Sequence, residues 1–130
     1  MKRLTIRIDF GENCQLGPGK IRLLELVDTQ GSITASAKMM DMTYRRAWLL
    51  IDDLNKMFEA PLVETRAGGR GGLNARLSIL GRAVVQLYRS LEKEAHETSA
   101  VRLDELERHL RKDRTAGVTD AKKPKRARKV

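Results

Sequence analysis

Cysteine, aromatic residues and long apolar stretches are all scarce in this chain of 130 residues. Cys14 is the single cysteine, which excludes an internal disulfide and a cluster of thiolate metal ligands. Phe, Tyr and Trp make up 4% of the residues, so a core has to be built from Leu, Ile, Val, Met and Ala. No apolar stretch approaches the roughly 20 residues that span a bilayer. We therefore expect a cytoplasmic protein that does not bind membranes.

Basic residues are abundant and unevenly distributed. The net charge of +9 and the pI of about 10.1 indicate a polyanionic partner. Nine of the 26 Lys and Arg lie between 111 and 130, together with only two of the 17 Asp and Glu. Residues 113–130 lack apolar periodicity, which predicts a basic, disordered tail. Such a tail either adds non-specific affinity for DNA through counterion release or simply keeps the chain soluble.

The periodicity of apolar residues predicts a mainly α protein with a small β component. Alternation of apolar and polar residues predicts a half-buried strand over residues 3–10. A helix is expected to begin near Pro18 and to end at Gly31. Two short strands are expected at 62–65 and 74–78, on either side of a glycine-rich loop.

Two short helices with a sharp turn between them are expected within 32–58. Ser32 and Thr43 are suitable N-terminal caps for the two helices. Asp41 lies between them, where its side chain tolerates a left-handed backbone conformation. The apolar spacing of the second helix predicts five residues that face the core: Ala47, Trp48, Ile51, Leu54 and Phe58.

The start of the second helix carries side chains suited to reading DNA bases. Arginine binds guanine through two hydrogen bonds, which contribute about 1–3 kcal/mol of discrimination. Free N–H groups at a helix start also favour phosphate. An ordinary helical hairpin with a solvated basic end is the alternative. The predicted base-reading residues are Thr43, Tyr44, Arg45 and Arg46.

The glycine-rich loop at 67–73 is the second candidate site. We interpret it as the wing of a winged helix-turn-helix, in which arginine side chains bind a phosphate strand or enter the minor groove. A mobile surface loop and a nucleotide phosphate cradle are the alternatives, although no P-loop pattern is present. The predicted phosphate and wing residues are Lys38, Arg66, Gly69, Arg70, Gly71 and Arg76.

The C-terminal part of the chain is predicted to be helical up to the tail. Ser78 can cap a long helix, and a coiled-coil-like seam follows it. A separate short helix, capped by Ser99, is expected over 98–112 as a C-terminal extension. The seam residues are Leu80, Val84, Leu87 and Leu91.

Catalytic motifs are absent from the sequence. His96 and His109 lie thirteen residues apart on charged helical faces, and no cysteine pair or nucleophile motif accompanies them. We therefore expect neither an enzyme nor a bound cofactor.

Residues 17–97 resemble the N-terminal DNA-binding domain of the ModE-type molybdate-responsive regulators. The residues that carry the resemblance are Tyr-x-x-Ala-Trp at 44–48 and Gly-Gly-Arg-Gly-Gly at 68–72. Further matches include Gly31-Ser32-Ile33, Leu62-Val63-Glu64 and Gln86-Leu87-Tyr88. The helix-turn-helix alone is also similar to the LysR-type pattern. Asp41 departs from the resemblance, because the family usually has glycine in this turn.

The resemblance implies a winged helix-turn-helix domain over 1–97 that regulates transcription as a homodimer bound to duplex DNA. It also implies a dimer interface formed by the first helix and by the helix after Ser78, through Ile21, Leu24, Leu80, Val84, Leu87 and Leu91. The family's oxyanion-binding modules have no counterpart in the sequence, so no molybdate site is expected. A sequence-independent nucleoid-type protein and a winged-helix module that binds proteins remain as alternatives.

Overall fold

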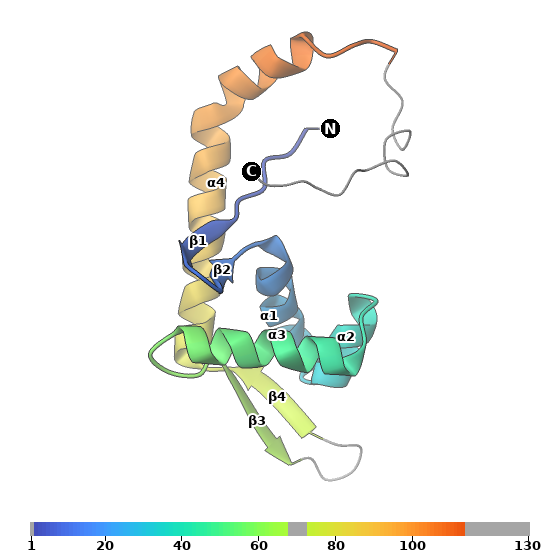
Figure 1. Cartoon of the computed structure of the whole chain (residues 1–130), viewed down its shortest axis with the longest axis vertical. Helices are drawn as coiled ribbons and strands as arrows, with labels where there is room; N and C mark the ends of the chain where they lie inside the picture. Colours follow the sequence, from blue (N-terminus) through green and yellow to red (C-terminus); the bar gives the residue numbers. More distant parts are fainter. Residues whose placement is uncertain (1, 68–72, 114–130) are drawn as a thin grey trace.

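The computed structural model describes residues 2–67 and 73–113 of the chain. Three of the helices are short and the fourth is long, and Figure 1 shows the short helices and a β-hairpin gathered beside the long helix, which extends beyond them. Each of the two hairpins, β1–β2 and β3–β4, is a separate antiparallel sheet of two strands. The elements in chain order are β1 (Ile8–Gly11), β2 (Cys14–Leu16), α1 (Pro18–Gln30), α2 (Ile33–Met39), α3 (Tyr44–Met57), β3 (Val63–Ala67), β4 (Leu73–Leu77) and α4 (Ile79–Arg108).

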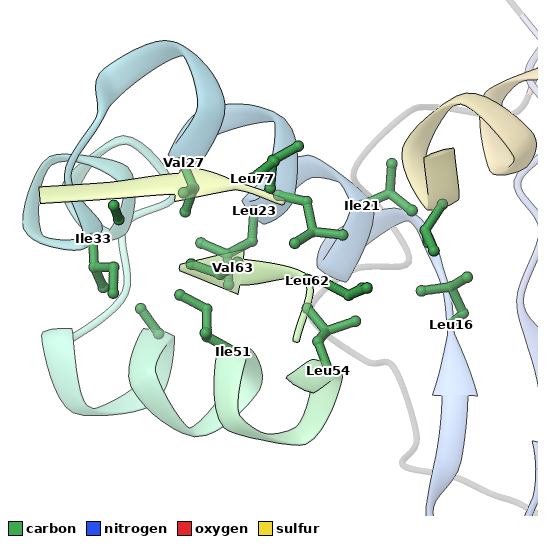
Figure 2. Packing of buried hydrophobic residues seen from close by; sticks show 14 of the residues in the cluster. Leu16, Ile21, Leu23, Val27, Ile33, Ile51, Leu54, Leu62, Val63 and Leu77 are labelled. Atoms are coloured by element: carbon green, nitrogen blue, oxygen red, sulfur yellow. The ribbon is translucent and has the colours of Figure 1, made fainter. Parts of the chain in front are cut away.

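The hydrophobic core lies between α1, α3 and the β3–β4 hairpin. Leu23 of α1, Ile51 of α3 and Val63 of β3 meet there in Figure 2, and none of them is more than 3% exposed. Each buried side chain of this size contributes about 1.5–3 kcal/mol relative to an exposed one. The core thus consists mainly of aliphatic residues, in keeping with the low aromatic content of the sequence.

Three of the helices begin at side-chain caps that the sequence predicts. The hydroxyl oxygens of Ser32, Thr43 and Ser78 each accept a hydrogen bond from the backbone N–H three residues later, at 3.1, 3.0 and 2.9 Å. Gly31, after α1, and Asp41, between α2 and α3, have left-handed φ angles of 68° and 55°. The predictions for these five positions are confirmed.

Hydrogen bonds fix the base of the β3–β4 hairpin to the helices. The side-chain oxygen of Asn55, on α3, accepts hydrogen bonds from the N–H groups of Leu62 and Val63 at 2.8 and 3.0 Å. The backbone N–H of Ser78 donates to the carbonyl oxygen of Leu62 at 2.9 Å. The hairpin therefore has a defined position relative to both α3 and α4.

The strand predicted over residues 3–10 is wrong in extent. The structure has a hairpin instead, with β1 beginning only at Ile8 and a bulge between Asp9 and Gly11. Asn13 in its turn has a φ of 55°. Gly11 and Asn13 are typical turn residues, so the sequence does contain a signal for this turn. The preceding residues run beside α4, where the Tyr88 hydroxyl donates to the carbonyl oxygen of Ile6 at 2.6 Å.

The separate helix predicted over 98–112 does not exist, because α4 runs without a break from Ile79 to Arg108. The hydroxyl groups of Thr98 and Ser99 donate to carbonyl oxygens of the preceding helical turn and do not cap a new helix. Most of the predicted tail, residues 114–130, lies outside the described residues.

Several predicted dimer residues lie in the core of a single chain. Ile21 and Leu24 are 0% exposed and Val84 is 6% exposed, so these three side chains are not available to a partner, which corrects their assignment. Of the remaining seam residues, Leu80 packs partly against the core. Leu87 and Leu91 are 69% and 45% exposed. Apolar residues spaced three and four positions apart predict a buried stripe on a helix, but this spacing does not show whether the same chain or a second chain covers the stripe.

Candidate nucleic-acid interface

The turn between α2 and α3 presents the first turn of α3 to solvent. The backbone N–H of Met42 donates to the carbonyl oxygen of Ala37 at 3.0 Å, which closes the turn around the left-handed Asp41. Thr43 caps α3, and the three residues that follow it are exposed. The predicted base-reading residues therefore lie together at one exposed helix end. They do not all point in the same direction.

Tyr44 lies on the side of α3 that faces the β3–β4 hairpin. The indole N–H of Trp48 donates to the Tyr44 hydroxyl, and the two rings meet edge to face with centroids 6.4 Å apart. Asn55, which holds the base of the hairpin, lies further along the same side, about three turns away. Trp48 is only partly buried, so its prediction as a core residue is corrected: it packs at the margin of the core and supports Tyr44.

Arg46 points to the opposite side of α3. Successive residues of a helix are rotated by about 100°, so Arg46 lies on another face than Tyr44. Its side chain lines a groove together with Lys20 of α1 and Arg7 of the N-terminal segment. Arg45 points outward between the two sides and is exposed. The predicted base readers thus do not share one side of the helix.

The cations around this helix end are not neutralised by acidic residues. Within 2–67 and 73–113, no ion pair is formed by Lys38, Arg45, Arg46 or Arg66, and all four are exposed. Arg76 differs, because its guanidinium lies 3.2 Å from Glu64 on the neighbouring strand. These four unpaired charges lie on α2, α3 and β3.

The predicted wing residues divide between described and undescribed parts of the chain. Arg66 and Arg76 lie on β3 and β4, where Glu64 pairs in register with Arg76 and Arg66 with Asn74. Gly69, Arg70 and Gly71 lie outside the described residues. The antiparallel register nevertheless fixes where the loop leaves and re-enters the hairpin, since Ala67 pairs with Leu73.

Some charges on α1 and α4, in contrast, pair with each other within the fold. The Arg89 guanidinium donates two hydrogen bonds to the Glu25 carboxylate, both at 2.9 Å, and a third to Glu92 at 2.7 Å. The hydrogen bonds from Arg89 lower the pKa of Glu25 below its ordinary value. This two-pronged pair joins α1 to α4.

Sequence reasoning missed both Asn55 and the pair of Arg89 with Glu25. Asn55 is a polar residue beside the apolar stripe of α3, which is a weak signal of a buried hydrogen-bond role. The Arg89–Glu25 pair joins residues 64 positions apart, and no local pattern indicates such a contact.

No group of three or more His, Cys, Asp or Glu side chains within the described ranges is placed to hold a metal ion. None of the described helices is both long enough and apolar enough to cross a membrane.

Comparison with known proteins shows that this chain is similar to ModE and Mop proteins. It is 38% identical over 105 residues to the molybdenum transport protein ModE of Azotobacter vinelandii, a match that covers 81% of this chain and 38% of the relative. It is 40% identical over 78 residues to the molybdenum-pterin-binding protein MopA of Rhodobacter capsulatus, covering 60% and 29%. It is 39% identical over 71 residues to the DNA-binding transcriptional dual regulator ModE of Escherichia coli K12, covering 55% and 27%. No protein-family model matches the chain.

These matches correct the resemblance inferred from the sequence. The chain spans between 27% and 38% of the length of these relatives. The relatives include a molybdenum-pterin-binding protein as well as regulators, so the similarity is to the ModE and Mop proteins as a group. The narrower assignment, to a ModE helix-turn-helix domain without its molybdate module, is wrong. The names also conflict with the expectation that the chain has no molybdate site. They are the names of regulators and of molybdenum-binding or molybdenum transport proteins, and none is that of an enzyme.

Proposed function

We propose that this chain is a transcriptional regulator that binds a specific sequence of double-stranded DNA. The observation that carries the proposal is the exposed first turn of α3, which presents unpaired arginine side chains on the same helix whose Asn55 holds the base of the β3–β4 hairpin. A helix end of this kind fits the major groove, and the adjacent hairpin then reaches the backbone or the minor groove. The similarity to ModE regulators supports the same function.

The order of the elements supports a winged helix-turn-helix arrangement. In this proposal α2 and α3 are the two helices of the motif, and the β3–β4 hairpin with its glycine-rich loop is the wing. Gly31 contributes to this arrangement, because its carbonyl oxygen accepts a hydrogen bond from the N–H of Ala75 at 3.0 Å. The loop before α2 is thereby joined to β4.

The exposed side chains divide in this proposal into those that contact bases and those that bind phosphates. Tyr44 and Arg45 contact base edges, and the Thr43 hydroxyl, which caps α3 through its oxygen, still has a proton to donate. Lys38 and Arg66 bind phosphates, because their ammonium and guanidinium groups are exposed and have no acidic partner among residues 2–67 and 73–113. Arg76 joins them once its surface pair with Glu64 opens.

We further propose that the chain acts as a homodimer through α4. Leu87, Leu91 and Val101 are 69%, 45% and 80% exposed on this helix. Successive residues of this group are separated by four and ten positions, which keeps all three on one side of the helix. A two-fold axis along this side would present two copies of α3 to one DNA molecule, about 34 Å apart or a multiple of that distance.

A selection experiment tests the proposal. The chain is used to enrich binding duplexes from a pool of random sequence, and affinity is then measured for the enriched duplex and for a scrambled version. We expect at least a thousandfold preference for the enriched duplex at physiological salt. Equal affinity for the two duplexes would favour a sequence-independent nucleoid-type protein. No binding to either duplex, even at about 50 mM salt, would favour a module that binds proteins. Repeating the titration with molybdate tests whether it is an effector, because two of the relatives have molybdenum in their names.

A further inference from the structure

A basic groove lies on the side of α3 away from the β3–β4 hairpin. It has a volume of about 330 Å³ and is bounded by the N-terminal segment and hairpin, the first turn of α1, and the start of α3. Three of its lining residues are cations, Arg7, Lys20 and Arg46, and none is a carboxylate. In Figure 1, β2 and the start of α1 lie on one side of α3 while β3 and β4 lie on the other.

The positive charge of this groove is largely uncompensated. Arg46 has no ion pair within the described ranges. The Lys20 ammonium donates to the carbonyl oxygen of Gln15 at 2.9 Å and lies 3.9 Å from the sulfur of Met57. These contacts orient Lys20 without neutralising it, and one of its three N–H donors remains available. Arg7 pairs with Asp9 at 3.0 Å, but both side chains are more than 60% exposed, so this pair exchanges readily with solvent and other anions.

An α-helix that lies in the major groove of DNA has one phosphate strand on each side. The major groove is about 12 Å wide, so an inserted helix approaches both of its walls. With α3 inserted, the β3–β4 hairpin lies toward one strand. The groove that contains Arg7, Lys20 and Arg46 then lies toward the other.

We infer that this groove binds the second phosphate strand of the duplex and that Arg46 is a backbone contact and not a base reader. The inference rests on the proposed function and deepens it, because it gives Arg7 of the N-terminal segment and Lys20 of α1 a role in binding. The protein would hold the duplex from both sides of α3, with the β3–β4 hairpin on one strand and Arg7, Lys20 and Arg46 on the other. Phosphate contacts fix register and orientation without reading sequence.

Salt dependence of binding tests this inference. Each lost phosphate contact reduces the slope of log affinity against log salt by about 0.9. Arg7→Ala, Lys20→Gln and Arg46→Ala should each show this loss, and each should weaken binding to enriched and scrambled duplexes by the same factor. The affinity ratio of wild type to variant should therefore fall about 3.5-fold between about 50 and 200 mM salt. Lys93→Gln is the matched control, because it removes one exposed cation from the side of α4 away from Leu87 and Leu91 and should leave the slope unchanged.

Asp9→Asn provides a test of opposite sign. It releases Arg7 from its carboxylate partner, so affinity for both duplexes should increase. Unchanged slopes for Arg7→Ala and Lys20→Gln in a protein that still binds duplex DNA would overturn the inference and leave the proposed function intact. If Arg46→Ala changed the ratio of the affinities for enriched and scrambled duplexes, Arg46 would be shown to read bases. A wild-type protein that binds no duplex would overturn the proposed function, and this inference with it.

Discussion

Gly81→Ala should destabilise the fold, although glycine-to-alanine replacements within helices are usually stabilising. Gly81 is the third residue of α4, and its N–H donates to the cap oxygen of Ser78 at 2.9 Å. A Cβ atom at this position would lie 2.3 Å from the carbonyl oxygen of Leu62 and 3.1 Å from its carbonyl carbon. Both are backbone atoms, so the clash can be relieved only if α4 moves away from the start of β3.

Two effects of opposite sign determine the size of the change. Helix propensity favours alanine over glycine by about 0.8–1.0 kcal/mol. Insertion of an extra carbon into a tight contact typically costs about 1–3 kcal/mol. The required movement also lengthens the hydrogen bond from Ser78 N–H to the Leu62 carbonyl, which is 2.9 Å long and contributes about 1 kcal/mol. We therefore expect the free energy of unfolding to fall by about 1–3 kcal/mol.

Urea unfolding followed by circular dichroism, at one fixed protein concentration, measures this difference. Gly19→Ala is the matched control: Gly19 also lies in the first turn of a helix, but a Cβ atom added there would meet nothing within 4 Å. This control should leave stability unchanged or raise it by up to about 1 kcal/mol. A Gly81→Ala protein as stable as wild type would refute the reasoning that α4 and Leu62 are in fixed, close contact.

Four further predictions concern the candidate interface and its support. Asn55→Leu should lower the free energy of unfolding by about 2–3 kcal/mol in urea titrations, since it leaves two backbone N–H groups without their acceptor; an unchanged midpoint would show that water replaces the amide. Arg45→Ala should reduce the preference for enriched over scrambled duplex by about 1–3 kcal/mol in binding titrations, and an equal loss for both would make it a phosphate contact. Leu87→Glu should convert a dimer into a monomer in light scattering without loss of helical signal, because Leu87 is 69% exposed; a dimer that persists would place the interface elsewhere. Glu25→Gln should lower the free energy of unfolding in urea titrations above pH 4.5, and this difference from wild type should disappear in more acidic solution. The folded pKa of Glu25 is lowered, so the stability from its charged form is present above pH 4.5 and is lost as the pH falls through that lowered value.

Local sequence signals predicted the parts of this fold that depend on a few neighbouring residues. The caps at Ser32, Thr43 and Ser78 require only a hydroxyl three residues before a free N–H. The turn at Asp41 requires only a side chain that tolerates positive φ. Both are decided within one helical turn, so one sequence is enough to find them.

The parts that were missed depend on contacts between distant residues. The apolar spacing of Ile21, Leu24 and Val84 predicted buried positions, but it carried no information about whether the covering surface belonged to the same chain. Ser99 has the chemistry of a cap, yet it binds the turn before it, because α4 continues through this position. In the candidate interface, the sequence identified the exposed arginine residues of α3. What faces Tyr44 on one side of this helix and Arg46 on the other depends on how the β3–β4 hairpin and α1 pack around it.

The separation between paired and unpaired charges makes the candidate interface open to direct tests. Arg89 binds two carboxylates and joins α1 to α4, so its replacement would alter the fold as well as any binding. Arg45 and Arg66 are exposed and have no ion pair within 2–67 and 73–113, and surface replacements of this kind usually change stability by less than about 0.5 kcal/mol. A loss of DNA affinity in variants of these two residues therefore measures lost contacts to DNA. The same loss in Asn55 or Gly81 variants would instead measure a displaced hairpin. A variant that loses both stability and DNA affinity therefore marks a residue that holds the interface in position. A variant that loses affinity alone marks a residue that touches the duplex.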